Sequence, residues 1–593
     1  MNRYKLAACA VAFVCLLPEY AQTNHIPTHI PARRSSQIHD GFGINTDLPR
    51  NPYLPWDRWW WTRMFDAGIQ WARIGQYENS TDYTSWDWVE RKRGEYTIAP
   101  QVEDYVNSLV ENGVNVEMQL LYGNPLYTSA AGQTPEVITP LPGSAHTPDR
   151  SIYSVFWPPK TPEQIQAFTN YVRWMVKHFR GRVGYYEIWN EPNDEFWNPD
   201  STPEEYGRLF KLAIPAVHES DPDAKIVFGG LGGTGRTFTK RALDACQCGE
   251  GIDVFAYHVY PDYGHNMNPE AMDDAKHEQV SPKKLRDMVR AYPGIRTDLI
   301  FWDDESNSIP SWPNSDESVQ RKYIPRGMLY DRAAGVRMFV WCLAAGTDGN
   351  EGDDFGLIHG MMFRPNDFTP RPAFESMRNT IALFSDTKLD ASVDVKSLAS
   401  TDEKVLSYAF RSTSGKAIVA YWLPVHSEPG DRFPIAKRPL TIRNSGITHP
   451  VLIDVDTGQI SPLQWKAGTT DTLESVPVSD SARAITDASY FDWPEIPDAP
   501  SGLVIDRSGA DPKLHWQLHG PAEFVVVERR SKDGGTWQQL AKLPSHATTY
   551  SANSDSEDSA AYRVRAGNAA GVSAYSNIVR NTARSTARNQ EAK

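Results

Sequence analysis

The sequence predicts an α/β protein, namely a (β/α)8 TIM barrel followed by antiparallel β-sandwiches. The first observation is that eight short apolar segments alternate with amphipathic helical segments between residues 37 and 375. Such alternation is typical of parallel β/α units, and a span of about 340 residues fits a barrel with enlarged loops. The second is that short alternating strands replace helical periodicity from residue 376 onward, which indicates antiparallel sheets.

The strand candidates are short apolar runs, and they span residues 39–45, 69–74, 114–121, 184–190, 225–230, 252–258, 298–304 and 336–343. Helical spacing of apolar residues marks 100–113, 161–179 and 203–220, and Thr161 followed by Pro162 is a typical helix start. A doubly wound open sheet is the alternative, but it should carry a Gly-rich phosphate loop after an early strand. The sequence has none there, and we interpret the Gly-rich residues 229–235 as a turn.

Two further units follow the predicted barrel. The stretches "VLSYAF", "AIVAYWL" and "VLIDVDTG" predict a β-sandwich over residues 376–491, and the Pro-rich residues 492–502 predict a stiff linker. Residues 498–582 resemble a fibronectin type III domain in "AYRVRAGNAAGVSAYSN", where Tyr562 matches the tyrosine corner, and in the early core residue Trp516. The resemblance implies a spacer or a module that docks on the cell envelope or on polysaccharide. The polar residues 583–593 predict a disordered tail.

Charge and the N-terminal pattern limit the function classes. The net charge of −14 leaves no basic footprint for nucleic acid or for an anionic membrane, which excludes both as partners. Arg3 and Lys5 precede the apolar residues 6–17, which is typical of a signal peptide, here residues 1–22. This apolar stretch is too short to span a membrane, and no other segment is long enough. We therefore expect a secreted, periplasmic or cell-surface protein.

The cysteines predict no metal site. Cys246, Cys248 and Cys342 remain after removal of the signal peptide, and they are too few for a disulfide framework. Cys246-Gln247-Cys248 lacks the second pair that a zinc site would need.

Two groups of carboxylates follow predicted strands of the barrel. In "YYEIWNEPNDEFW", Glu191 stands where the fourth strand ends, and "DLIFWDDESNS" places Asp303, Asp304 and Glu305 at the end of the seventh. Reacting groups of such barrels lie at the C-terminal ends of the strands, and strands four and seven are nearly opposite. Cleavage of a glycosidic bond needs an acid at the leaving oxygen and a carboxylate at the anomeric carbon. Two inward carboxylates from these strands could therefore flank one small molecule in the arrangement that this cleavage needs.

A family resemblance supports this interpretation. "EIWNEPN" followed by "FW" resembles the retaining glycoside hydrolases of the large barrel clan, and residues 185–230 are most similar to family 39, which includes β-xylosidases, α-L-iduronidases and bacterial exopolysaccharide glycosidases. The resemblance covers roughly residues 37–375 and also implies the sandwich that follows. It implies that Glu191 is the acid/base, that Asn190 binds the sugar 2-hydroxyl and that Glu305 is the nucleophile.

The seventh strand departs from the family pattern, in which the nucleophile usually follows Thr and precedes an aromatic residue. Here the order is Asp304-Glu305-Ser306, which leaves Asp303 and Asp304 open as alternatives. Strand alternation predicts that Asp303 faces inward with Glu305 and that Asp304 faces away. A bulge would make Asp304 the alternative nucleophile.

The resemblance implies further site residues at other strand ends, with a structural role as the alternative for Arg73, His258, Tyr260 and Trp341. Glu187 and Glu195 are interpreted as residues outside the chemistry. The further site residues are Arg73, which would keep the nucleophile ionised, His258 and Tyr260 beside the nucleophile, Trp341 as the floor of the sugar subsite, and Tyr122 and Asn124 along the cleft.

The predicted function is that of a secreted retaining glycosidase that hydrolyses an oligo- or polysaccharide, β-xylosidase-like or exopolysaccharide glycosidase-like, through a glycosyl-enzyme. It needs a carbohydrate substrate and neither a metal nor an organic cofactor. The alternatives are a transglycosylase, which passes the glycosyl group to a sugar, and a non-catalytic carbohydrate-binding protein.

Overall fold

The computed structural model describes residues 26–46, 64–77, 80–81, 83–128, 156–194, 196–261, 267–343, 355–359, 370–397, 404–508, 512–531, 537–552 and 560–581. The predicted signal peptide (1–22), Glu195 and the predicted tail (583–593) lie outside these residues. In the described part of the chain, no helix has the length and apolar character needed to cross a bilayer.

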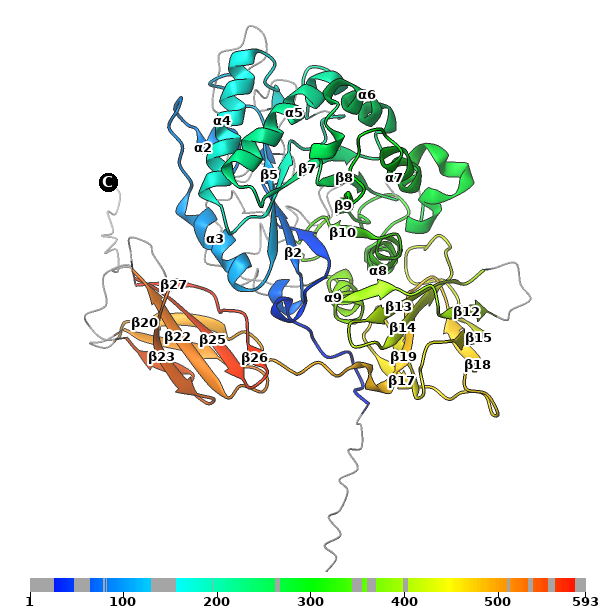
Figure 1. The fold of residues 1–593 in the computed structure, drawn as a ribbon. Helices are drawn as coiled ribbons and strands as arrows, with labels where there is room; N and C mark the ends of the chain where they lie inside the picture. Colours follow the sequence, from blue (N-terminus) through cyan, green and yellow to red (C-terminus); the bar gives the residue numbers. More distant parts are fainter. Residues whose placement is uncertain are drawn as a thin grey trace, which may run out of the picture.

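A closed barrel of parallel strands forms the first domain, which confirms the predicted fold class (Figure 1). All eight predicted strands are present, with ends that differ by a few residues from the predicted ones. Around the barrel the order is β1-β10-β9-β8-β7-β6-β5-β2. The strands are β1 (Gly43–Asn45), β2 (Trp71–Ile74), β5 (Asn115–Leu120), β6 (Tyr185–Ile188), β7 (Lys225–Gly232), β8 (Val254–Val259), β9 (Ile300–Ser306) and β10 (Val336–Val340).

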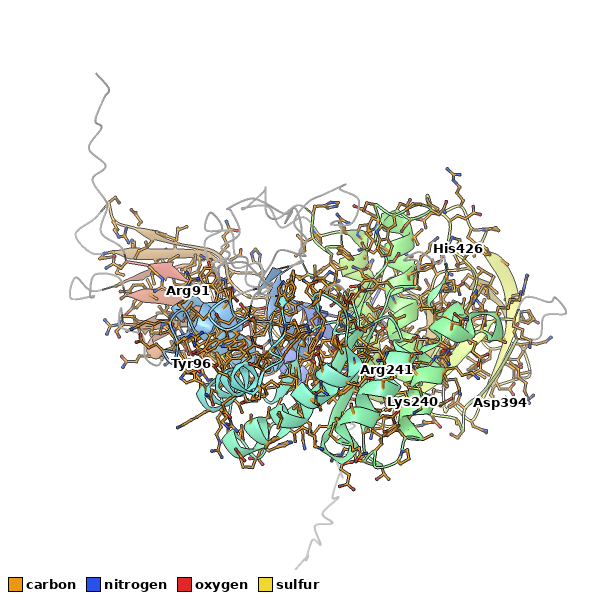
Figure 2. All side chains as sticks on the ribbon, turned by 90° about the horizontal axis from the view of Figure 1, so that it is seen from above. Arg91, Tyr96, Lys240, Arg241, Asp394 and His426 are labelled. Carbon is orange, nitrogen blue, oxygen red and sulfur yellow. A yellow bond between two sulfur atoms is a disulfide. The ribbon has the colours of Figure 1, made fainter. Side chains whose placement is uncertain are left out.

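Helices surround the barrel, and α4 shows why the sequence forms them. The Thr161 side chain accepts from the Gln164 N–H in a capping box, Pro162 occupies the first turn, and Phe168 and Met175 are buried on one face. On the outer side, Lys240 and Arg241 are exposed on α6 (Figure 2). The helices are α2 (Trp86–Val89), α3 (Pro100–Glu111), α4 (Pro162–His178), α5 (Pro203–Ser220), α6 (Arg236–Cys246), α7 (Pro282–Arg290), α8 (Glu317–Ala333) and α9 (Pro372–Phe384).

Two strands of the barrel, β7 and β9, contain irregularities that the sequence analysis did not predict. The Gly-rich segment predicted as a turn begins inside β7, which runs on to Gly232 with a register shift between Phe228 and Leu231. Gly230 has φ +51°, and a Cβ there would lie 1.9 Å from the Glu187 carboxylate, so only glycine fits. The second shift is in β9, where Tyr257 of β8 pairs with Asp303 but His258 pairs with Glu305.

An aromatic layer closes the end of the barrel at which the strands begin. Trp302 of β9 lies 5.1 Å from Trp71, 5.0 Å from Tyr185 and 5.3 Å from Phe339 between ring centroids. These rings come from four different strands, so their packing ties the barrel together below the candidate site.

The predicted sandwich after the barrel has a six-stranded and a three-stranded antiparallel sheet. The larger sheet holds β11 (Thr387–Leu389), β13 (Leu406–Ser412), β14 (Ala417–Trp422), β19 (Arg483–Asp487), β16 (Pro450–Asp454) and β17 (Ile460–Pro462). The smaller sheet holds β12 (Asp394–Ser397), β15 (Ala436–Arg443) and β18 (Thr472–Val478).

The last unit also consists of two antiparallel sheets, and it lies beside α3 (Figure 1). Tyr562 and Trp516 are buried in one apolar cluster, while the fibronectin type III assignment stays a prediction. Arg563 forms an ion pair with Glu111 of α3 at 2.6 Å. The strands are β20 (Ser501–Asp506), β21 (Lys513–Gln517) and β24 (Thr549–Ser551), and β23 (Gln538–Pro544), β22 (Phe524–Arg530), β25 (Ala561–Asn568), β26 (Gly571–Val572) and β27 (Val579–Arg580).

Cys246 and Cys248 form a disulfide at the end of α6. The sequence analysis did not predict this bond. It joins residues only two positions apart, so it fixes a local turn and does not form a framework. Cys342 carries a buried thiol.

Candidate active site

Glu191 and Glu305 meet at the C-terminal end of the barrel. A carboxylate oxygen of each and a ring nitrogen of His258 all lie within 4.8 Å of one another. Tyr260 donates from its hydroxyl to Glu305 at 2.7 Å, and Arg73 donates to the other oxygen of Glu305 at 3.0 Å. The structure therefore brings together residues from β2, β8 and β9 and from the segment after β6, as the sequence predicted.

An unusual backbone conformation places Glu191. Trp189 has φ 72° and Glu191 has φ 43°, both in the left-handed region that non-glycine residues seldom adopt. The Glu191 N–H donates to the Gly230 carbonyl at 2.8 Å, and the Trp189 indole donates to the Phe196 carbonyl at 2.9 Å. These hydrogen bonds hold the turn that lifts Glu191 out of the strand. Such strain is characteristic of functional positions.

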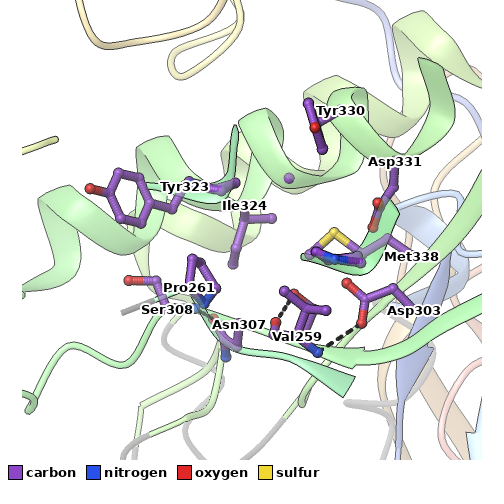
Figure 3. A pocket seen from close by; sticks show the side chains of 14 residues that line it. Val259, Pro261, Asp303, Asn307, Ser308, Tyr323, Ile324, Tyr330, Asp331 and Met338 are labelled. Carbon is purple, nitrogen blue, oxygen red and sulfur yellow. Dashed lines mark hydrogen bonds between the residues drawn. The ribbon is translucent and has the colours of Figure 1, made fainter. Parts of the chain in front are cut away.

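Because of the bulge in β9, Asp303 and Asp304 face opposite to the predicted directions. Asp303 was expected to face inward, but it faces away from the barrel interior, accepting from the Val259 N–H at 3.1 Å. It lines a cavity of about 30 Å³ against α8, together with Asp331 (Figure 3). Asp304 was expected to face away, but it lies inside the barrel, 3.4 Å from His258 and 3.7 Å from Arg73. Because one residue is inserted, Asp304 and Glu305 both point inward.

Arg73 is the central cation of the site. Its Nε and Nη2 donate to the two oxygens of Glu187 at 2.8 and 3.0 Å. Nη1 donates to Glu305 and to Asn45, each at 3.0 Å, and Nη2 donates to Asn190 at 2.8 Å. The side chain is fully buried. Glu187, which the sequence analysis set aside, therefore fixes the guanidinium that holds Glu305.

Burial and neighbouring charges shift the pKa values of this cluster. Burial lowers the pKa of Arg73, but the charges of Glu187, Asp304 and Glu305 outweigh it and raise that pKa well above its ordinary value. Burial raises the pKa of Glu305, and the Glu191 charge adds to this, whereas His258 and Arg73 lower it. Burial also raises the pKa of Asp304 well above its usual range. The cluster thus contains more carboxylates than one guanidinium neutralises.

His258 is neutral, and its contacts identify the tautomer. Burial lowers its pKa to about 4. Its Nε2 lies 3.3 Å from Arg73 Nη2, and because arginine can only donate, Nε2 must be the acceptor. The proton is therefore assigned to Nδ1, which donates to Glu191 Oε1 at 2.7 Å. His258 in this form stabilises the ionised state of Glu191.

Asn190 presents an amide donor. Its Oδ1 accepts from Arg73 and, at 3.2 Å, from Gln119. Its buried Nδ2 makes no well-formed hydrogen bond in the described part of the chain, and only the Tyr122 hydroxyl oxygen is near enough to interact with it. A buried donor of this kind is costly unless a bound group accepts from it, which fits the predicted contact to a sugar hydroxyl.

The remaining predicted residues differ in their placement. The Trp341 ring shares an apolar cluster with Tyr260 and Phe355, so it lies beside the nucleophile candidate. Burial and the Glu191 and Glu305 charges raise the pKa of Tyr122, while Asn190 lowers it, so Tyr122 lies beneath the site. Asn124 is not brought to the site.

Asn124 instead stabilises the backbone around α2 through hydrogen bonds. It is fully buried, and its Nδ2 donates to the carbonyls of Trp86 and Glu90 at 3.1 and 2.9 Å. Its Oδ1 accepts from the Leu126 N–H at 2.9 Å. With these atoms committed to the backbone, the prediction of a cleft contact is corrected to a structural role.

Two sets of side chains could bring three ligand atoms to a metal ion. They are Glu187, His258 and Asp304, and Glu191, His258 and Glu305. The Arg73 guanidinium already donates to Glu187 and to Glu305 at 2.8–3.0 Å. A cation would therefore have to compete with a fixed positive charge, and the donor set fits a metal poorly.

Known proteins resemble this part of the chain. Residues 151–334 match the family model described as Glycosyl hydrolases family 39. A beta-xylosidase from Caldicellulosiruptor saccharolyticus is 30% identical over 165 residues, which are 25% of this chain and 32% of that protein. The chain thus matches about a third of that relative's length. A solved family 39 glycoside hydrolase from Bacteroides cellulosilyticus WH2 shares the fold, with TM-score 0.56 and 20% identity over 77% of this chain and 83% of that one.

Proposed function

Since the segment that carries Asn190, Glu191, His258 and Glu305 is that of glycosyl hydrolases family 39, we propose that the protein is a retaining glycoside hydrolase. The observation that carries the proposal is that one carboxylate oxygen of Glu191 and one of Glu305 lie within 4.8 Å of each other. Retaining enzymes keep their two carboxyl groups about 5–5.5 Å apart, whereas inverting enzymes leave roughly 6.5–9.5 Å for a water molecule. The short separation supports the retaining reaction.

In the first step, a Glu305 oxygen attacks the anomeric carbon while the bond from that carbon to the leaving oxygen breaks. Protonated Glu191 gives its proton to the leaving oxygen, so the products are a free alcohol and a glycosyl ester of Glu305. In the second step, ionised Glu191 takes a proton from water, and the water oxygen attacks the anomeric carbon. This step releases the sugar and regenerates the Glu305 carboxylate and the Glu191 acid.

The surrounding groups assist both steps. Arg73 and Tyr260 donate to different oxygens of Glu305, so they orient the carboxylate before it attacks. When Glu305 becomes an ester its negative charge disappears, which removes a charge that opposed ionisation of Glu191. The Nδ1–H of His258 then stabilises Glu191 as the base. The Nδ1–H of His258 can keep donating to Oε1 of Glu191 while Oε2 of Glu191 carries the proton that the acid gives to the leaving oxygen.

For the substrate, we propose an O-glycosidic bond of an oligo- or polysaccharide, with β-xylosides as the first to test because the matching relative is a beta-xylosidase. We also propose that the protein acts outside the cytoplasm. The disulfide between Cys246 and Cys248 supports this location, since disulfides persist in oxidising compartments.

The experiment compares hydrolysis of a panel of nitrophenyl glycosides by the wild type, Glu191→Ala and Glu305→Ala. Glu219→Ala, an exposed acid on α5, is the matched control. We expect turnover by the wild type and the control, and its loss in the two site variants. NMR of the first-formed sugar should show the same anomeric configuration as the substrate. An inverted product, or variants as active as the wild type, would overturn the proposal.

A further inference from the structure

A second cavity lies at the opposite end of the barrel from the candidate active site, where β9 and β10 begin. Its volume is about 350 Å³, which falls in the range of small-molecule pockets. The lining comes from four segments that are distant in sequence: residues 40–42 before β1, 300–302 of β9, 332–337 between α8 and β10, and 387–389 of β11. The cavity therefore forms where the barrel meets the first strand of the sandwich.

The charged groups of this lining are mostly cationic. Arg332, Arg337 and Lys388 line the cavity with one carboxylate, Asp40. The two arginines share that carboxylate: Arg332 Nη2 lies 3.2 Å from one oxygen and Arg337 Nη2 lies 2.9 Å from the other. The Arg332 and Arg337 side chains are 10% and 19% exposed, so their charges are largely removed from water.

Buried arginines elsewhere in the chain are better neutralised. The charges around Arg73 raise its pKa despite burial, and Glu270 does the same for Arg326 with two hydrogen bonds. For Arg332 and Arg337 the balance is reversed: burial lowers the pKa of each, and the carboxylates, Asp40 for both and also Asp386 for Arg332, offset it only in part. The positive charge of Arg332 lowers the pKa of Arg337 further. The positive charge of this cavity thus exceeds its negative charge.

Aromatic rings and backbone carbonyls hold the two guanidinium groups in place. The Arg337 guanidinium carbon lies 4.3 Å over the Trp71 ring, and that of Arg332 lies 5.2 Å over Phe42. Arg332 also donates to the Thr387 carbonyl at 2.5 Å, and Arg337 donates to the Gly41 carbonyl at 3.1 Å. These fixed groups would lose little conformational entropy on binding an anion.

An apolar rim adjoins the charged wall. Ile300 is 40% exposed and Leu389 is 48% exposed, and both line this cavity. Large aliphatic side chains this exposed gain from contact with an apolar ligand group. We propose that this cavity binds a small organic anion, whose carboxylate or phosphate head lies between Arg332 and Arg337 and whose apolar body lies against Ile300 and Leu389. The inference is independent of the proposed glycosidase activity.

Isothermal titration calorimetry of the full chain tests the proposal with benzoate and phenyl phosphate, and with neutral benzyl alcohol as the control ligand. We expect one or both acids to bind and the alcohol not to bind. Binding of benzoate alone identifies a carboxylate ligand, and binding of phenyl phosphate alone identifies a phosphate. Each acid is titrated up to about 10 mM, which would detect even a weak dissociation constant for a small ligand. If neither acid binds in this range, the proposal is wrong.

Three variants locate the binding. Lys388→Glu reverses an exposed charge at the rim and should weaken binding roughly tenfold, whereas Lys437→Glu on β15 should leave it unchanged. Asp40→Asn removes the carboxylate that competes for both arginines, so it should tighten binding. Equal affinities for the two lysine variants, or weaker binding by Asp40→Asn, would contradict the proposal. Glu305→Ala should bind the acids like the wild type, which separates this cavity from the active site.

Discussion

The two ends of the barrel carry opposite imbalances of buried charge. At the end where the strands finish, several carboxylates surround one guanidinium; they are Glu117, Glu187, Glu191, Asp304 and Glu305 around Arg73. At the end where the strands begin, the Arg332 and Arg337 guanidiniums share Asp40. The aromatic layer of Trp71, Tyr185, Trp302 and Phe339 separates the two ends.

The signs of the two imbalances suit different ligands. Glycoside cleavage passes through an oxocarbenium-like transition state, which is positive, and excess negative charge in a dry site stabilises it. Burial, with a smaller contribution from neighbouring carboxylates, raises the pKa values of Glu305 and Asp304, so their charged forms are already costly before substrate binds. At the opposite end, the buried positive charges of Arg332 and Arg337 are costly in the same way, and a bound anion would reduce that cost. The comparison indicates that buried charge without sufficient counter-charge marks a ligand-binding site.

The largest expected effect comes from removing the attacking carboxylate. Glu305→Gln should lower kcat by at least about 10⁴-fold, because covalent catalysis is lost. Asp303→Asn is the matched control on the same strand. Since Asp303 faces away from the barrel interior, it should keep kcat within about tenfold of the wild type. Initial rates on an aryl glycoside measure both. The reverse pattern would mean that the β9 register differs from the one described.

The next effect concerns stability and compares one cation from each end. Arg73→Met leaves the buried carboxylates of the active-site end without their shared cation, which should cost roughly 3–5 kcal/mol in unfolding free energy. Arg337→Met should cost less, because it also removes repulsion with Arg332 and because a methionine can still pack on Trp71. Urea denaturation at neutral pH measures both values. An equal or larger cost for Arg337→Met would contradict the proposed charge comparison.

At the active-site end, His258 should make the unfolding free energy depend on pH. The pKa of His258 is lowered to about 4 in the folded protein, whereas an unfolded histidine has its ordinary value near 6.5. Between these values the unfolded chain binds more protons, so this contribution to stability is present above pH 6.5 and is lost as the pH falls toward 4. It amounts to roughly 3 kcal/mol. The buried carboxyls with raised pKa values act in the opposite direction, so a difference measurement is needed.

His258→Asn isolates this contribution. The difference in unfolding free energy between wild type and variant should shrink as the pH falls from 6.5 to 4. The exposed His546 provides the control substitution, and the pH-dependent change should be larger for His258→Asn than for His546→Asn. A flat difference for His258→Asn would mean that His258 titrates normally in the folded protein.

The sequence sufficed for the barrel and for most of the active site, because both follow from local patterns. Apolar runs located the eight strands, and Glu191 and Glu305 follow from their place at strand ends. The orientation of Asp303 and Asp304 could not be predicted, since the bulge in β9 depends on its pairing with β8. Asn124 was misplaced because its partners Trp86 and Glu90 come from α2 and its C-terminal end, which are distant in sequence.

Long-range partners account for the other differences. Glu187 was set aside because nothing near it in sequence shows that Arg73, 114 positions away, needs a bidentate acceptor. Arg73 and Glu187 both stand near the C-terminal ends of their strands, β2 and β6, where reacting groups of such barrels gather, and this position was a signal that could have found Glu187. The cationic cavity joins residues from position 40 to position 389, so no local pattern predicts it.

The smallest expected effect is at the cationic end. Asp40→Asn removes the carboxylate between two arginines, but its side chain is 48% exposed, so solvent screening limits the loss to about 1 kcal/mol. Inorganic phosphate should recover part of this loss, because it can take the place of the carboxylate between the guanidiniums. Asp394→Asn is the control, since Asp394 is 40% exposed and pairs with Lys396 on the sandwich. Thermal denaturation with and without phosphate should show a larger stabilisation of Asp40→Asn than of Asp394→Asn; equal shifts would mean that phosphate acts on the whole chain rather than at this cavity.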